Sequence, residues 1–348
     1  MKLSILDQSP VRVGDSPRQA LQETLQLAQH VEALGYHRFW VSEHHNTTLL
    51  AGSAPEVLLA AIGAATSQIR IGSGGVMLPH YSAFKVAESF SLLSNLYPGR
   101  IDLGVGRAPG SDMQTAKLLA TDGKPKFERF PVLVQELRQM LTDPTMRPRV
   151  TPEPTNPPPI WILGSSHESA LLAAHLGLPY NFALFINSQM IPQLFELYRN
   201  EFQPSAQLAE PYTMLTVNAI CGETEAEALT LSMSRRLLWL RFARGESGVK
   251  VPTVEEAEQY PYSAQEMAFL DNKFQQSAIG DPRQVRQKLS QLASNFGANE
   301  LMTVTITHDF EARLRSYDLL AQAFKLTAKL PEVGTSAGES SQRQPVHA

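Results

Sequence analysis

RFWVSEHH, residues 38–45, joins a run of bulky apolar residues directly to one carboxylate and two imidazoles. The apolar run predicts a buried strand. In α/β architectures the carboxyl ends of parallel strands meet at one edge, and sites are built there. A capped turn is the alternative, since Asn46 and Thr47 follow directly. Glu43, His44 and His45 are therefore candidate site residues if the rest of the chain folds as α/β.

Strand and helix patterns alternate on both sides of this stretch. The predicted strands cover residues 3–6, 38–41, 69–72, 101–104, 160–163, 181–185, 214–221 and 300–305. A helical pattern follows each of them, and the first begins at a capping Ser16 with Pro17 in its first turn. Eight such units favour a closed (β/α)8 TIM barrel over an open doubly wound sheet.

Two insertions interrupt the alternation. Residues 108–159 form an insertion after strand 4 with one predicted helix, and residues 245–277 form an irregular insertion before strand 8. We expect the second insertion to cover the mouth of the barrel. Residues 1–330 are predicted to form a single barrel domain. Residues 331–348 carry few apolar side chains and are predicted to be a disordered tail.

The composition argues against several kinds of partner. The net charge of −4 comes without a basic run, so no nucleic-acid partner is expected. No apolar stretch is long enough to span a bilayer, and the N-terminus does not resemble a signal peptide. Cys221 is the only cysteine, which excludes an intramolecular disulfide. The predicted location is the cytoplasm.

Polar residues and glycines gather where the predicted strands end. The segment Gly164-Ser165-Ser166-His167-Glu168-Ser169 supplies hydroxyls and the free N–H groups of a helix start, which suit a phosphate. The alternative is that its serines merely cap the helix. Arg107, after the preceding strand, could add the charge that phosphate favours. Gly74-Gly75 either allows close approach to a flat ligand or marks a tight turn. Asp7 and Asn181 belong to the same edge.

Other motifs are weak. The third glycine of GVGRAPG, residues 104–110, comes one residue too late for a dinucleotide fingerprint, and a GxxxxGK phosphate loop is absent. His44 and His45 are adjacent and have no second ligand cluster, so no metal is predicted.

Several motifs together resemble one known family. They are EHH at 43–45, GSGGVMLP at 72–79, PGRIDLGVGR at 98–107, APGSD at 108–112 and GSS at 164–166. In this combination the chain is similar to the bacterial-luciferase-like flavin monooxygenases, in their single-chain branch. The likeness runs from Leu3 to Leu326.

The resemblance implies that reduced FMN binds at the carboxyl ends of the strands and is supplied by a separate flavin reductase. It places the phosphate at Arg107, Ser166 and Ser169, beside the Ser165 amide in the turn that Gly164 begins. It also implies a cis peptide at Gly74-Gly75 against the flavin ring, Glu43 near the flavin, and His44 as the catalytic histidine. A neutral imidazole near its ordinary pKa can move a proton.

The resemblance therefore implies an FMN-dependent monooxygenase that oxygenates a small organic substrate with dioxygen through a flavin hydroperoxide. The expected assembly is a homodimer. Gly106 stands where luciferase has a cysteine, and light emission is not expected. One alternative is a deazaflavin (F420)-dependent oxidoreductase that transfers hydride. Another is a flavin-binding protein without turnover, against which the presence of Glu43 and His44 argues. A barrel hydrolase lacks a nucleophile–base pair.

Overall fold

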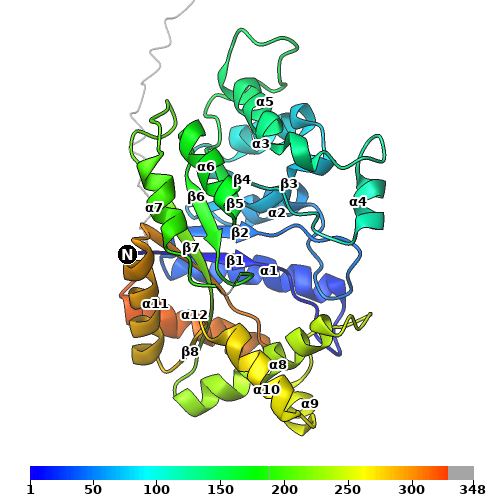
Figure 1. Ribbon diagram of the computed structural model, residues 1–348, viewed down its shortest axis with the longest axis vertical. Coiled ribbons are helices and arrows are strands. Elements are labelled where there is room, and N and C mark those ends of the chain that lie inside the picture. Colours follow the sequence, from blue (N-terminus) through cyan, green and yellow to red (C-terminus); the bar gives the residue numbers. More distant parts are fainter. Residues whose placement is uncertain (188, 328–348) are drawn as a thin grey trace, which may run out of the picture.

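Eight parallel strands close into a barrel with helices around it (Figure 1). The computed structural model describes residues 1–187 and 189–327. The strands pair in the order β1-β2-β3-β4-β5-β6-β7-β9, and β9 pairs back onto β1. The predicted (β/α)8 TIM barrel is confirmed. The predicted tail at 331–348 lies outside the described residues.

The strands are β1 (Lys2–Asp7), β2 (Arg38–Val41), β3 (Arg70–Met77), β4 (Ile101–Gly106), β5 (Ile160–Gly164), β6 (Tyr180–Ala183), β7 (Thr213–Cys221), β8 (Ala278–Gly280) and β9 (Glu300–Val304). The helices are α1 (Pro17–Ala33), α2 (Pro55–Ala65), α3 (Ala83–Leu96), α4 (Met113–Leu119), α5 (Phe130–Thr142), α6 (His167–Leu176), α7 (Gln193–Asn200), α8 (Glu225–Ala243), α9 (Val254–Gln259), α10 (Ala264–Phe274), α11 (Pro282–Phe296) and α12 (Phe310–Phe324). Two short 3-10 turns cover Leu78–His80 and Phe127–Arg129.

The strands read as apolar runs because both of their faces are covered. In β2, Phe39 and Val41 pack outward into the layer between strands and helices, whereas Trp40 joins the cluster inside the barrel with Leu6 and Met302. Several helices begin at capping side chains, as the sequence predicts for α1. Ser16 caps α1 by accepting the Gln19 N–H (3.2 Å).

Three elements differ from the sequence prediction. Strand β3 does not stop before the glycines but continues through Gly74-Gly75 to Met77, with a bulge that lies opposite Gly104 of β4. The insertion at 245–277 is not irregular, because it contains α9 and α10. Each of these helices begins with a side-chain cap, at Thr253 and Ser263, and packs an apolar face against α8. Strand β8 then pairs only with the end of β7.

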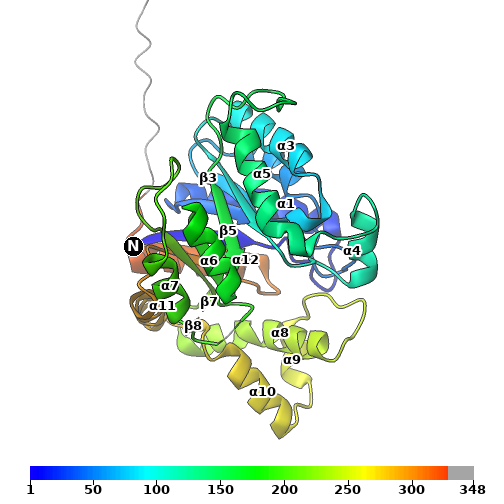
Figure 2. The same cartoon turned by 45° about the horizontal axis from the view of Figure 1, so that its top comes forward.

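Helices α8, α9 and α10 form a group beside the barrel, which both ribbon views show (Figures 1 and 2). Part of the insertion reaches the barrel loops. Val251 exchanges backbone hydrogen bonds with residues 11 and 13 after β1, and Thr48 donates its hydroxyl to the Val249 carbonyl (3.1 Å). The insertion therefore lies against the loops that follow β1 and β2. Among the described helices, none is both long and apolar enough to cross a bilayer.

A buried charge network fills the barrel interior at the opposite end, where the strands begin. Arg38, the first residue of β2, donates to Asp102 Oδ2 (2.7 Å) and to Glu300 Oε1 (3.0 Å). Asp102 also pairs with Arg70, and Glu300 accepts the Tyr212 hydroxyl (2.8 Å). Because active sites of such barrels lie at the opposite end, where the strands finish, we assign this network to stability.

Candidate active site

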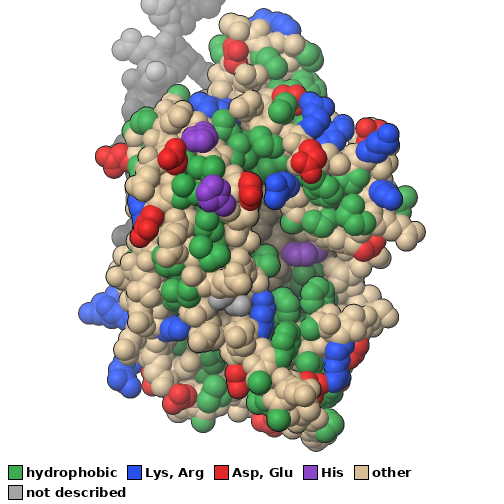
Figure 3. Space-filling view, viewed as in Figure 1, with side chains coloured by type: hydrophobic (Ala, Val, Ile, Leu, Met, Phe, Trp, Pro, Cys, Tyr) green, Lys and Arg blue, Asp and Glu red, His purple; other side chains and the backbone are tan. Residues whose placement is uncertain are grey.

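The loops after β2, β3 and β4 are tied to one another at the carboxyl ends of the strands, where the loop after β5 also lies. Glu43 bonds a residue at the end of β3, and the His45 N–H donates to the Gly110 carbonyl after β4 (3.1 Å). Figure 3 shows a recess in the surface between the part of the molecule around α4 and the part around α8. The structure thus brings the predicted residues of four loops to one end of the barrel.

Glu43 is a buried carboxylate, 1% exposed, with three partners. Its Oε2 accepts the Met77 N–H (3.0 Å), and its Oε1 accepts the Tyr81 hydroxyl (2.6 Å) and lies 2.8 Å from His45 Nε2. Burial first and then the Glu43 charge raise the pKa of Tyr81, so its phenol stays protonated. Glu43 therefore fixes the β2 loop against the end of β3. Sequence reasoning missed Tyr81 and the Met77 amide, because both become neighbours only through the fold.

His44 is half-buried and its Nδ1 lies 3.1 Å from Ser42 Oγ. Burial lowers the pKa of His44 to about 4, and the charge of His45 adds to this against the opposing effect of Glu43. The imidazole is therefore neutral at neutral pH, as expected. Its pKa is not near the ordinary value, however, so at neutral pH His44 is a proton acceptor or a hydrogen-bond donor and not a stored acid.

The Gly74–Gly75 bond is cis, as the resemblance implied. A side chain has no space on either glycine. A Cβ on Gly75 would lie 2.7 Å from the Gly104 carbonyl oxygen, and a Cβ on Gly74 would lie 2.6 Å from Leu6 Cδ1. On β4, a Cβ on Gly104 would lie 2.2 Å from the Ser73 carbonyl oxygen. The bulge is thus a bare strip of backbone at the site.

Arg107 and the first turn of α6 lie near each other. Glu168 has its pKa lowered first by a hydrogen bond with the Ser166 hydroxyl, then by its own backbone N–H and by the positive charge of Arg107. Arg107 is exposed and pairs with no carboxylate among the ion pairs of the described residues. Sequence reasoning did not single out Glu168, whose negative charge lies beside the predicted phosphate position.

The serines of this turn also cap α6, which was the alternative to a phosphate site in the sequence analysis. The Ser166 hydroxyl accepts the Ser169 N–H (3.4 Å), and the Ser169 hydroxyl donates to the Ser166 carbonyl (2.7 Å). Gly164 is needed beneath them, because a Cβ there would lie 2.4 Å from Ser169 Oγ. Capping leaves the first N–H groups of the helix available, so the two interpretations are compatible. Ser165 is half-buried in the same turn.

Two other predicted edge residues are used differently. Asp7 pairs with Arg313 (2.5 Å) and accepts the Thr24 hydroxyl (2.5 Å), so it links β1 to α1 and α12. Asn181 accepts the Thr216 hydroxyl (2.8 Å) inside the barrel. Within the part of the chain that the structure describes, no group of three acidic, histidine or cysteine side chains could hold a metal.

Comparison with known proteins gives the family. A family model described as luciferase-like monooxygenase matches residues 1–300. The chain belongs to the luciferase-like monooxygenase family.

Relatives in this family match the chain over most of their length. A luciferase-like monooxygenase of Escherichia coli K12 is 40% identical over 318 residues, which cover 91% of this chain and 95% of that one. The N-acetyl-S-alkylcysteine monooxygenase of Bacillus subtilis is 39% identical over 336 residues, which cover 93% and 98%.

Solved structures share the barrel. Apo-MsnO8 superposes with a TM-score of 0.90 at 40% identity and covers 94% of this chain and 99% of its own. The oxygenating constituent of 3,6-diketocamphane monooxygenase of Pseudomonas putida, solved in complex with FMN, has a TM-score of 0.68 at 18% identity and covers 93% and 97%. An F420-dependent secondary alcohol dehydrogenase has a TM-score of 0.65 at 14% identity and covers 92% and 98%. The last two likenesses show the fold alone.

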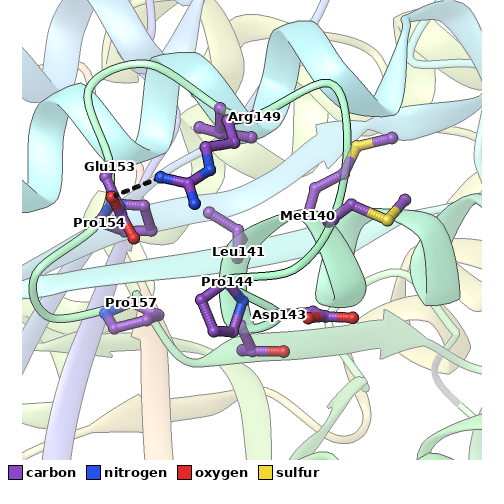
Figure 4. Close-up of a pocket in the computed structure, with 11 residues that line it drawn as sticks. Met140, Leu141, Asp143, Pro144, Arg149, Glu153, Pro154 and Pro157 are labelled. Atoms are coloured by element: carbon purple, nitrogen blue, oxygen red, sulfur yellow. Dashed lines mark ion pairs between the residues drawn. The ribbon is translucent and has the colours of Figure 1, made fainter.

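A surface pocket lies elsewhere, in the loop between α5 and β5 (Figure 4). It is lined by Met140, Pro144 and Pro157, and an ion pair between Arg149 and Glu153 (3.7 Å) crosses one side. This loop leads into the first residue of β5, so the pocket belongs to the end of the barrel where the strands begin. It is not part of the candidate active site.

We expect Gly75→Ala to destabilise the protein by about 1–3 kcal/mol, because the added methyl group meets a backbone oxygen that cannot turn away. Thermal unfolding measures the loss. Gly106→Ala is the matched control, since a Cβ at that position, the last residue of β4, meets nothing within 4 Å. Equal unfolding temperatures for the two variants would contradict the claim that the bulge has no space for a side chain at Gly75.

Proposed function

We propose that the chain is an FMN-dependent monooxygenase that uses reduced FMN and dioxygen to oxygenate a small organic substrate. The observation that carries the proposal is the arrangement of three features at one end of the barrel: the side-chain-free bulge at Gly74-Gly75, the Glu43–His44 loop beside it, and the Arg107–α6 turn. A flat ring fits the first, and a phosphate fits the third.

Reduced FMN, when bound, supplies the electrons that activate dioxygen. The chain's own residues hold and orient it. Arg107 and the α6 N-terminus, with Ser165, Ser166 and Ser169, bind the phosphate, while Glu43 holds the β3 bulge that supports the ring. Neutral His44 accepts or returns a proton at an imidazole nitrogen during oxygenation. The α8–α10 group keeps water from the mouth.

The partners follow from this role. We expect a flavin reductase to supply the reduced FMN and the enzyme to work in the cytoplasm. A homodimer is expected as well, and Leu92 and Leu96, which are exposed and one turn apart on α3, are candidates for its interface. Light scattering of the pure protein measures the assembly.

The substrate is a small molecule. Because the Bacillus subtilis relative is named for N-acetyl-S-alkylcysteines, these thioethers are the first compounds that we would assay. Their sulfur atom is the position that accepts oxygen most readily.

Anaerobic titration with reduced FMN, followed by rapid mixing with oxygenated buffer, tests the proposal. We expect tight binding and a return of oxidised-flavin absorbance that is slower on the protein than for free FMN. Binding of a reduced deazaflavin in place of FMN would instead indicate the hydride-transfer alternative. FMN binding with reoxidation as fast as in buffer would favour a protein that only binds flavin.

Arg107→Met tests the phosphate assignment separately. We expect the Kd for FMN to rise about tenfold to a hundredfold while the Kd for riboflavin stays unchanged, because a charge-assisted contact to phosphate is lost. Arg129→Met is the control, since Arg129 is exposed and pairs with Glu136 (3.1 Å). Equal weakening of FMN and riboflavin binding would show that Arg107 does not bind the phosphate.

A further inference from the structure

Arg235, on α8, is a buried arginine whose charge no carboxylate balances among the described residues. Its side chain is 4% exposed, and its Nη2 donates to Asn218 Oδ1 (2.5 Å). The other two guanidinium nitrogens, Nε and Nη1, have no hydrogen-bond acceptor. The two comparably buried arginines are different: Arg38 pairs with two carboxylates, and Arg313 pairs with Asp7.

A buried cation without a counter-charge is costly, and removing the partner of a buried pair typically destabilises a protein strongly. The titratable groups that act on Arg235 are Tyr317, which is neutral at neutral pH, and Arg313, which is itself positive. Burial lowers the pKa of Arg235 only to about 10, so the guanidinium remains charged. The ligand-free chain therefore carries an unbalanced positive charge at this position.

Arg235 lies at the mouth end of the barrel, beside β7. Asn218 is in the second half of β7, and Leu238, one turn further along α8, packs into the interior cluster with Trp40. In the closed barrel β7 is separated from β5 by one strand and from β4 by two. The flavin phosphate assigned to Arg107 after β4 is thus on another side of the mouth from Arg235.

A second cation without a carboxylate lies close by. Lys273 of α10 is half-buried, and its Nζ donates to the carbonyl of Ile186, in the loop after β6 (2.7 Å). Burial lowers the pKa of Lys273, and the positive charge of Arg235 adds to this effect. The region over β6 and β7 therefore holds two cations, together with the neutral amide of Asn218.

We propose that Arg235, with Lys273 beside it, binds the carboxylate of an anionic substrate on the β6–β7 side of the barrel mouth. The inference rests on the proposed function, and it adds the charge class of the substrate. Since Nε and Nη1 are sealed from solvent in the ligand-free chain, binding includes a rotation of the Arg235 side chain toward the anion. Half-exposed Lys273 is the cation that the anion meets first.

The first test compares acids with their amides by calorimetry on the full chain without flavin. The probes are hexanoate with hexanamide, and N-acetyl-S-methylcysteine with its primary amide. We expect each acid to bind about tenfold or more tightly than its amide, because the amide lacks the charge that Arg235 recognises. Equal affinities, or no binding of the acids, would overturn the proposal.

Two variants locate the preference. Arg235→Met should abolish the preference for acids over amides by weakening the binding of the acids alone. Arg236→Met should retain this preference, because the neighbouring Arg236 already pairs with Asp271 (2.5 Å). In the ligand-free chain, Arg235→Met should raise the unfolding temperature by a few degrees, since it removes an unbalanced buried charge. A lower unfolding temperature would indicate a structural role and overturn the assignment.

Flavin titration tests whether the anion that Arg235 binds is the flavin phosphate or the substrate carboxylate. Arg235→Met should leave the Kd values of reduced FMN and riboflavin unchanged. Selective weakening of FMN would make Arg235 the flavin phosphate site and overturn the substrate assignment. Because the acid–amide comparison contains no flavin, a failure of the native chain to bind FMN would count against the proposed function and not against the anion site.

Discussion

His44→Ala is expected to lower oxygenated product per flavin oxidised by about a hundredfold or more and to leave the Kd for reduced FMN nearly unchanged. The imidazole is half-buried and neutral, so one of its two ring nitrogens can accept a proton, and it carries no charge that would help to bind the flavin. Product analysis after single-turnover mixing, with an N-acetyl-S-alkylcysteine as the first substrate, measures the ratio.

The pH dependence carries a second signature. Because burial holds the pKa of His44 at about 4, its neutral form persists through neutral pH, and the rate should fall only as the pH drops toward that value. In His44→Ala, this fall in rate at acidic pH should be absent. His175→Ala is the control, since His175 is half-exposed and lies 3.6 Å from Glu201 on the outside of α6. Unchanged product yield in His44→Ala would exclude the proton role.

Arg38→Met should lower the free energy of unfolding by about 3–5 kcal/mol, because it leaves the carboxylates of Asp102 and Glu300 buried with less positive charge. Chemical denaturation measures the loss. Arg149→Met is the control, since its pair with Glu153 (3.7 Å) is exposed, and such pairs contribute little. A loss for Arg38→Met as small as that of the control would contradict the assignment of the network to stability.

The sign of the pH effect follows from Asp102. Burial alone would raise its pKa, but Arg38 and Arg70 together hold it below its usual range. Its contribution to stability is therefore present at neutral pH and is lost as the pH falls through the lowered pKa. The difference between native protein and Arg38→Met should narrow on acidification, because a protonated carboxyl no longer needs a cation.

The sequence was sufficient for the barrel because its strands are buried on both faces, which leaves unbroken apolar runs such as Ile160–Leu163. It was also sufficient for Glu43, His44 and Arg107 as strand-end residues. It ended the third strand too early, at residue 72, although the strand continues through Gly74-Gly75 to Met77. Only the contact with Gly104 shows why side chains are absent there.

Other features could not be found from local patterns. The Arg38 network joins residues from the starts of separate strands, and the lack of a partner for Arg235 is a property of three-dimensional packing. Helices α9 and α10 did leave a signal, because Thr253 and Ser263 each stand three residues before a glutamate, as a helix cap does.

The segment from α8 to α10 begins and ends at one place, the carboxyl end of β7. Its departure follows β7 and its return is β8, and the Gly222 N–H donates to the Gly280 carbonyl (3.2 Å) where the two ends meet. A loop closed in this way can change length or sequence with little effect on the closure around it. Apart from its contacts with Thr48, with residues 11 and 13 and with the interior cluster, the segment that carries Arg235 and Lys273 is thus free to vary in sequence. In our proposal, a new substrate range can evolve there while the residues that we assign to the flavin stay as they are.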